Sequence, residues 1–276
     1  MYEHTQSEIS EYVKFSKKEN SLLLKASLLL SILYTLLAIR FTSTHWIILL
    51  VPIILWTFFL LRTHFLFHKY CAYKQAFKLE FQELYFDRFH LEPYETLTKR
   101  GFTKKPISYS ILSFIIALLS IGFVVLNNLF TYTHKKIDHL FYGNRKIFEI
   151  TMGHVYVQEN TAVRQSYAFF FSFLLIIFYI LILSFFKTQH TIILILLIIT
   201  ISYGFWYLFP LLPTLGYQYF NTNSYLWLSS VGMFFIVSIF GLLLQNPQSI
   251  LNLSLFTSVI FLVIMFVRYT NHITPD

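Results

Sequence analysis

One long charge-free stretch limits what this chain can fold into. Residues 188–267 contain no Asp, Glu, Lys or Arg, in a chain of 276 residues of which 12% are charged. An apolar run of about 20 residues is long enough for a helix that crosses a bilayer, whereas a single soluble domain cannot hide this much uninterrupted apolar sequence. Pro210, Pro213 and the polar residues 245–248 divide the stretch into three such runs. We therefore expect an integral membrane protein.

Four further apolar runs bring the expected number of spans to seven. Two runs precede a polar segment at residues 62–106 and five follow it, so the predicted fold is an all-α integral membrane protein with seven transmembrane helices arranged as two plus five. The runs cover residues 22–41, 46–61, 107–130, 166–186, 191–210, 225–244 and 250–267.

Four regions follow from these runs. They are an N-terminal interfacial tail (residues 1–21), a two-helix transmembrane hairpin (22–67), an amphipathic charged connection (68–106) and a five-helix transmembrane bundle (107–276) with a polar loop at 131–165. Phe77, Phe81, Leu84 and Phe89 recur at helical spacing, which predicts an amphipathic helix over about residues 65–90. Within the polar loop, residues 146–157 have the pattern of a short β-hairpin.

The formal net charge of +8 comes from Lys and Arg residues that lie between and beside the apolar runs. In those positions they meet lipid phosphates, and no nucleic-acid-binding module is recognisable, so nucleic acid is not an expected partner. With seven spans, the side of the membrane that holds the N-terminal tail carries twice as many Lys and Arg residues as the other side. The positive-inside rule then predicts an N-terminus on the matrix or cytoplasmic side.

Few residues offer catalytic chemistry. Ionisable groups at the centre of a span are the usual mark of proton relays and ion pathways, and no expected span has an acid near its midpoint. A single cysteine, Cys71, rules out an intrachain disulfide and a multi-cysteine metal site. No phosphate-binding glycine loop, GxSxG or CxxC motif occurs. We expect no catalytic residue, no metal and no cofactor in this chain, with bound phospholipid as its ligand.

The ten histidines all fall at or beyond the ends of the expected spans, so a histidine pair that holds haem between helices is not predicted. His64 and His68 are four residues apart, which places both rings on one face of a helix and supplies half of a metal site. The interpretation that we favour is an interfacial pair facing lipid headgroups beside Lys69. Interfacial tyrosines and tryptophans similarly fit a membrane belt better than a quinone site.

The architecture resembles cytochrome c oxidase subunit III. Arg62 follows the second span as a family arginine follows its aromatic pair, and His90 and Gly101-Phe102 fall where the family has a histidine and then a Gly-Leu pair. In the sixth span, Phe234-Phe235 and Phe240-Gly241-Leu242 are similar to the family's Phe-Phe and Phe-His-Gly-Leu, without the histidine. The family's third-span glutamate has no counterpart here. The Phe- and Tyr-rich, Gly-poor composition also resembles proteins encoded in ciliate mitochondrial genomes.

This resemblance implies a non-catalytic structural subunit of a respiratory complex in the mitochondrial inner membrane. In the family, the subunit packs beside a haem-copper catalytic subunit, carries no redox centre, and holds phospholipids in the cleft between its two-helix and five-helix parts. The expected lipid-headgroup contacts at the mouth of that cleft are Arg62, His64, His68, Lys69 and His90.

Two other functions stay open. An accessory membrane subunit of respiratory complex I would share this composition, although the antiporter-like core subunits need Lys and Glu within their spans. A bacterial transporter or membrane enzyme of unknown substrate, placed in the bacterial inner membrane, is the third hypothesis. The subunits that co-purify with the chain distinguish the three.

Overall fold

The computed structural model describes residues 12–39, 46–87, 90–93, 107–120, 130–137, 160–187, 190–210 and 215–244, together with three isolated positions further on. Five helices in this part are long and apolar enough to cross a membrane. They are α2 (Lys17–Ile39), α3 (Trp46–Lys74), α7 (Asn160–Phe186), α8 (Thr191–Leu208) and α10 (Ser224–Leu243). The prediction of a mainly helical, multi-pass membrane protein is confirmed. Only two isolated positions of the predicted span at 250–267 are described and the predicted hairpin at 146–157 lies outside the described residues, so the count of seven stays a prediction.

The first membrane helix, α2, begins at a reciprocal cap. The backbone N–H of Ser16 donates to Glu19 Oε2 (2.8 Å), and the backbone N–H of Glu19 donates to Ser16 Oγ (3.2 Å). This is the capping box expected from a Ser-x-x-Glu sequence, and it satisfies donors that a helix start otherwise leaves free. Helix α2 therefore begins at Lys17, five residues before the predicted start of the span.

Helix α3 is longer than a bilayer requires. Its 29 residues correspond to about 43 Å of helix, against a hydrocarbon thickness of about 30 Å. It continues unbroken past Arg62 to Lys74, so a span that begins at Trp46 leaves the last turns of α3 beyond the hydrocarbon. Ala76 then adopts a left-handed conformation (φ 65°), and its N–H donates to the Tyr73 carbonyl (2.9 Å), which closes the helix end.

The predicted amphipathic helix over residues 65–90 is wrong beyond Lys74. Residues from Phe77 to Asp87 form a strand, β1. Phe77, Leu79 and Phe81 are buried while Lys78 and Glu80 between them are not, so the apolar residues alternate with a period of two. Phe77 and Phe81 fit helical spacing equally well. Leu79 distinguishes a strand from a helix. In a helix its side chain would point away from those of Phe77 and Phe81, whereas in a strand all three lie on one face.

Strand β1 is the centre of a small sheet. Strand β4 (Phe130–Lys136) pairs antiparallel with its first part, with Phe77 opposite Lys136 and Glu83 opposite Phe130. The second part pairs antiparallel with β2 (His90–Pro93) and with β3 (Ile107–Ser108). The all-α prediction therefore needs correction in the segment between the helices, where a four-stranded sheet is formed.

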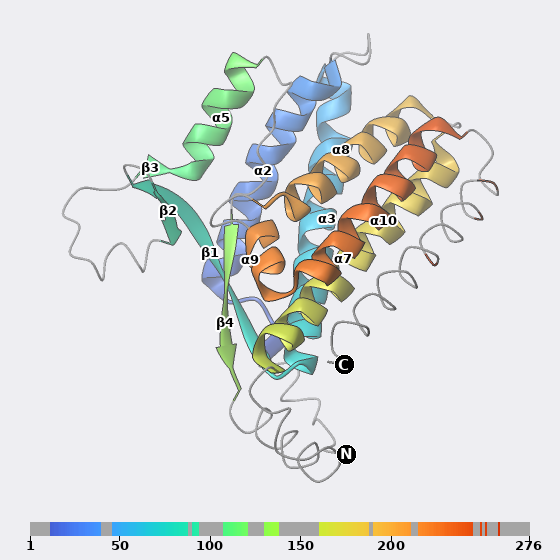
Figure 1. Ribbon diagram of the computed structural model, residues 1–276. Coiled ribbons are helices and arrows are strands. Elements are labelled where there is room, and N and C mark those ends of the chain that lie inside the picture. The colour runs from blue at the N-terminus through green and yellow to red at the C-terminus, as the bar shows by residue number, and fades with distance from the viewer. Residues whose placement is uncertain are drawn as a thin grey trace.

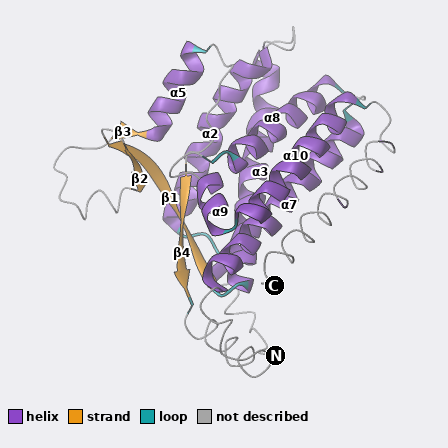
Figure 2. Cartoon of the chain, in the orientation of Figure 1, coloured by secondary structure: helices purple, strands orange, loops and turns teal. Residues whose placement is uncertain are grey.

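The helices and the sheet form two parts of one packed unit (Figure 1). Helix α3 packs against α2 on one side and α7 on the other, while α10 and α8 pack on α7. Helix α5 (Tyr109–Leu119), which is the described part of the third predicted span, contacts α2, β1 and β3. The described contacts thus place it beside the first membrane helix, and the two-plus-five grouping stays a prediction. Figure 2 shows the strands gathered at one side of the helices.

Single glycines allow close packing among α7, α8 and α10. A Cβ atom at Gly204 of α8 would lie 2.7 Å from the Phe234 ring of α10, and one at Gly241 of α10 would lie 2.5 Å from Ser184 Oγ of α7. Both distances are too short for real contacts. Glycine is therefore needed at these two positions for the helices to approach as closely as they do.

Candidate functional site

Four of the five predicted headgroup residues lie on α3, but on opposite faces of it. His64 and His68 are fully buried and the Lys69 residue is 3% exposed, because this face of α3 packs against α2, α7, α8 and the sheet. Arg62 is exposed on the other face. Protein atoms therefore separate three of the predicted residues from lipid, whereas Arg62 is open to it. Headgroup binding itself stays a prediction.

The fifth predicted residue, His90, belongs to a different part of the molecule. It begins β2 and stands opposite Asp87 in the register of the sheet. Asp87 is six residues along β1 from Phe81, whose ring lies 5.3 Å from the Lys69 ammonium, and a strand rises about 3.3 Å per residue. His90 is thus about 20 Å along the sheet from the part of β1 that contacts Lys69, so the structure does not bring the five predicted residues together.

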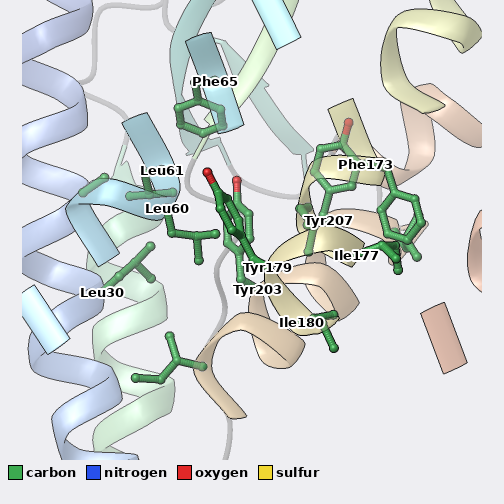
Figure 3. Packing of buried hydrophobic residues seen from close by; sticks show 14 of the residues in the cluster. Leu30, Leu60, Leu61, Phe65, Phe173, Ile177, Tyr179, Ile180, Tyr203 and Tyr207 are labelled. Atoms are coloured by element: carbon green, nitrogen blue, oxygen red, sulfur yellow. The ribbon is translucent and has the colours of Figure 1, made fainter. Parts of the chain in front are cut away.

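A buried tyrosine holds the ring of His64. The Nδ1 atom of His64 lies 2.8 Å from the hydroxyl oxygen of Tyr203 on α8, and the Tyr207 ring meets the His64 ring edge-on at 4.9 Å between centroids. Figure 3 shows Tyr203 and Tyr207 among the apolar core residues that surround them, including Leu60, Leu61 and Phe173. The bond links α3 to α8 in the interior of the bundle.

A third histidine joins the pair from the sheet. The ring of His134 on β4 lies 6.3 Å from the ring of His68, which in turn lies 6.2 Å from the ring of His64. Phe169 of α7 packs against both His68 (5.0 Å) and His134 (5.4 Å). We call His64, His68 and His134 the histidine cluster. It lies where the sheet meets the membrane helices.

The spacing of the cluster does not suit a metal ion. Three imidazoles around one ion bring their ring centroids to about 5 Å from each other, given metal–nitrogen distances of about 2.0–2.1 Å. The observed separations are larger, and no group of three His, Cys, Asp or Glu side chains in the described ranges has metal-binding geometry. The half-site that the sequence offered at His64 and His68 is therefore not completed by His134.

Burial keeps the His134 ring uncharged at neutral pH. The His134 ring is partly buried, with its Nε2 atom enclosed by protein and without a hydrogen-bond partner among the described residues. This loss of solvation lowers the pKa of His134 to about 4. At neutral pH the imidazole on β4 is uncharged, which is what its aromatic surroundings from Phe77 and Phe169 require.

Hydroxyl groups continue the polar interior away from the histidines. The hydroxyl of Tyr207 lies 2.9 Å from Ser172 Oγ on α7. Tyr219, on the short helix α9 (Leu215–Thr222), lies 2.8 Å from Ser230 Oγ on α10 and stacks on Phe169. Each of these contacts joins two different helices. The polar side chains therefore work as connections between elements.

A buried ion pair joins α3 to the start of α2. Lys69 Nζ donates to Glu19 Oε2 at 2.8 Å, and the backbone N–H of Phe81 on β1 donates to Glu19 Oε1 at 3.2 Å. The rings of Phe15 and Phe81 lie 5.0 and 5.3 Å from the ammonium nitrogen. Both charged side chains are buried, so the pair fixes the start of α2, the end of α3 and the first part of β1 to each other.

Sequence reasoning missed several of these residues for different reasons. Glu19 had a local signal, since it is the glutamate of a Ser-x-x-Glu capping sequence. Tyr203 and His134 had none, because their partners lie 139 and 66 positions away in the chain. Only the fold brings such residues together.

The chain was compared with protein-family models, with curated proteins and with solved structures, and none of the three comparisons found a significant match.

Proposed function

We propose that this chain is a non-catalytic, lipid-binding structural subunit of a respiratory membrane complex, with the subunit III position of cytochrome c oxidase as the preferred assignment. The observation that carries the proposal is how the bundle uses its interior polar groups. Trp56 Nε1 donates to Thr200 Oγ1 (3.0 Å) and joins α3 to α8, and the Tyr179 hydroxyl donates to Thr63 Oγ1 (2.9 Å) and joins α7 to α3. With the His64–Tyr203 and Ser172–Tyr207 contacts, these groups are occupied in holding helices together.

A transporter would use such groups differently. Solute and ion sites in membranes are lined by polar groups that face a water-filled cavity or a broken helix. A crevice that described residues line, between α2 and α8, is bordered by aliphatic side chains and Tyr34 and has no room for a water molecule. Its lining suits hydrocarbon better than a polar substrate. This favours the structural role over the transporter hypothesis.

The outer surface also suits a subunit of an assembly. Large apolar side chains are exposed along α7 and α10, among them Phe178, Phe185 and Phe235. Such surfaces are covered by lipid or by neighbouring membrane helices, and in the proposed role they face both. The expected partners are a haem-copper catalytic subunit and phospholipids, in the mitochondrial inner membrane.

Purification of the tagged full chain from its native membranes in a mild detergent tests the proposal. Untagged membranes carried through the same steps are the control, and mass spectrometry identifies the proteins recovered. Recovery of haem-copper oxidase subunits would support the preferred assignment. Recovery of NADH dehydrogenase subunits would transfer the chain to complex I, and recovery of the chain alone would contradict both respiratory assignments.

A further inference from the structure

The second half of α3 has two faces with different surroundings. The inward face holds His64, His68 and Lys69 within the protein, as described above. The outward face presents Arg62, Leu66, Phe67, Tyr70 and Lys74, of which Leu66 is 42%, Phe67 36% and Tyr70 38% exposed. Their spacing of four, five, eight and twelve residues from Arg62 keeps them on one side of the helix. We call these five residues the outward face of α3.

The two cations of this face are held by aromatic rings. The Lys74 ammonium lies 5.5 Å from the centroid of the Tyr70 ring, which stacks on Phe67 at 6.4 Å. The Arg62 guanidinium lies 5.7 Å from the centroid of the Phe58 ring one turn earlier. A cation over a ring keeps its outer hydrogen-bond donors free while its stem covers apolar surface. Both groups are therefore positioned to donate to an anion without leaving the helix surface.

The length of α3 places this face at the level of lipid headgroups. If the hydrocarbon begins at Trp46, about 30 Å of it ends after roughly 20 residues, near Leu66. Arg62 then lies just inside the boundary and Lys74 just outside the headgroup layer. Their long stems bring both charges toward the same layer from opposite sides, and Phe67 and Tyr70 lie between them, where aromatic residues prefer to be.

The charge of this end of the molecule favours an anionic headgroup. The exposed Lys17 at the start of α2 lies at the same end of the bundle as Lys74, since Glu19 two residues later pairs with Lys69 of α3. Two acids nearby are already paired, since Glu19 is bound to Lys69 and Glu80 to Lys135. A zwitterionic lipid would add a positive choline or ethanolamine group to this surface, whereas an anionic lipid adds negative charge alone.

We propose that the outward face of α3 binds the headgroups of anionic phospholipids through Arg62 and Lys74, with Phe67 and Tyr70 packed between them at the membrane boundary. This inference rests on the lipid-binding part of the proposed function. It assigns the binding to one exposed face of one helix and names the headgroup class. It also moves the lipid site from the buried residues His64, His68 and Lys69 to Tyr70 and Lys74.

Lipid retention by the purified full chain tests this site. The chain is reconstituted in nanodiscs of phosphatidylcholine and phosphatidylglycerol in equal amounts, and native mass spectrometry after extraction counts each bound lipid. The unaltered protein is expected to retain phosphatidylglycerol in preference to phosphatidylcholine. Arg62→Gln and Lys74→Gln are each expected to lower the affinity for phosphatidylglycerol about fivefold, the effect of one basic residue near a lipid surface. Lys17→Gln, which removes an exposed lysine at the same end of the bundle, is the matched control and is expected to change retention far less.

Three results would overturn the proposal. They are equal retention of the two lipids by the unaltered protein, an equal loss for Lys17→Gln and for Lys74→Gln, and displacement of phosphatidylglycerol by excess inorganic phosphate, which would indicate a site for free anions. Lys74 and Arg62 are exposed, so their replacement should leave the fold intact, and circular dichroism checks this. A chain that assembles with respiratory subunits but shows no lipid preference would refute this inference alone. A chain that prefers phosphatidylglycerol but purifies without partners would refute the proposed assembly alone.

Discussion

Tyr203 has a structural role that no sequence pattern indicates. Its hydroxyl forms a hydrogen bond with His64 Nδ1, and both residues are buried between α3 and α8. A buried polar atom that loses its hydrogen-bond partner lowers the free energy of unfolding by about 1–3 kcal/mol, because its desolvation is no longer compensated. The tyrosine therefore satisfies one of the two ring nitrogens of a histidine buried inside the bundle.

Tyr203→Phe is therefore expected to destabilise the protein by about 1–2 kcal/mol, since it removes the hydroxyl and leaves His64 Nδ1 without that partner. Thermal unfolding in detergent micelles measures the change. Tyr167→Phe, at a tyrosine 39% exposed on α7, is the matched control and is expected to shift the unfolding temperature very little. Equal shifts for the two variants would show that the buried bond adds nothing to stability.

Ala76 is the second residue with a specific demand. It adopts φ 65°, which costs an L-residue with a Cβ about 1–2 kcal/mol, and its carbonyl accepts a bond from the Ile137 N–H at the end of β4. Ala76→Gly should remove this strain and raise stability by up to about 1 kcal/mol, less the small loss of a buried methyl group. Ala76→Val should lower stability by about 2 kcal/mol or more, because a β-branched residue fits this conformation worst. Chemical unfolding curves that rank valine at or above glycine would contradict the observed helix end.

At the scale of elements, the helices were easier to predict than the strand that follows them. Apolar length alone predicted α2, α3, α7, α8 and α10, because the bilayer requires it. The segment from Phe77 was predicted as helix because Phe77 and Phe81 suit both periods, and the strand is decided by pairing with β4, which begins 43 positions beyond Asp87. No local pattern reveals such a partner. The same distance concealed the histidine cluster, since His134 comes from β4.

The Glu19–Lys69 pair couples two helices and the sheet. A double-mutant cycle on the free energy of unfolding should therefore show that the two residues interact. Glu19→Gln and Lys69→Met, made singly, each leave one buried charge without its partner and should cost about 3–5 kcal/mol. The double variant should cost clearly less than the sum. The pair of Glu80 with Lys135 on the sheet, whose lysine side chain is 60% exposed, is the control and should be worth about 0–1 kcal/mol in the same cycle. Additive losses for Glu19 and Lys69 would refute the coupling.

The position of His134 between the sheet and the helices predicts a loss of stability in acid. Its folded-state pKa of about 4 lies below the unfolded value of 6.5, so the unfolded chain takes up the proton first as pH falls. The contribution of the neutral His134 ring to the free energy of unfolding is fully present above pH 6.5. It decreases by about 3 kcal/mol as the pH approaches 4.

His134→Phe removes this titration while keeping an aromatic ring. The unfolding temperature of the native protein should fall relative to that of His134→Phe as the pH is lowered from 7 to 4, and the two should run parallel above pH 7. Circular dichroism in a micelle that does not itself titrate provides the measurement. A constant difference across the whole range would mean that His134 is not kept neutral by the fold.

At the scale of the whole molecule, the described elements form one interior in which polar groups link α2, α3, α7, α8 and the sheet. The sequence predicted the membrane, the helical spans and the basic end of α3. It did not show how the predicted headgroup residues are distributed around α3, because no local pattern indicates that His64 and Lys69 turn inward while Tyr70 and Lys74 stay outside. Which face of α3 turns inward depends on the elements that pack beside it, and those are determined by the fold.

The native mass of the particle that contains this chain tests the central claim most directly. The chain alone has a mass of 32.9 kDa. Native mass spectrometry of the tagged chain, extracted from its own membranes in a mild detergent, is expected to find it in a much heavier assembly whose other subunits include those of a haem-copper oxidase. A particle that consists of this chain with bound lipid alone would contradict the account of a structural subunit.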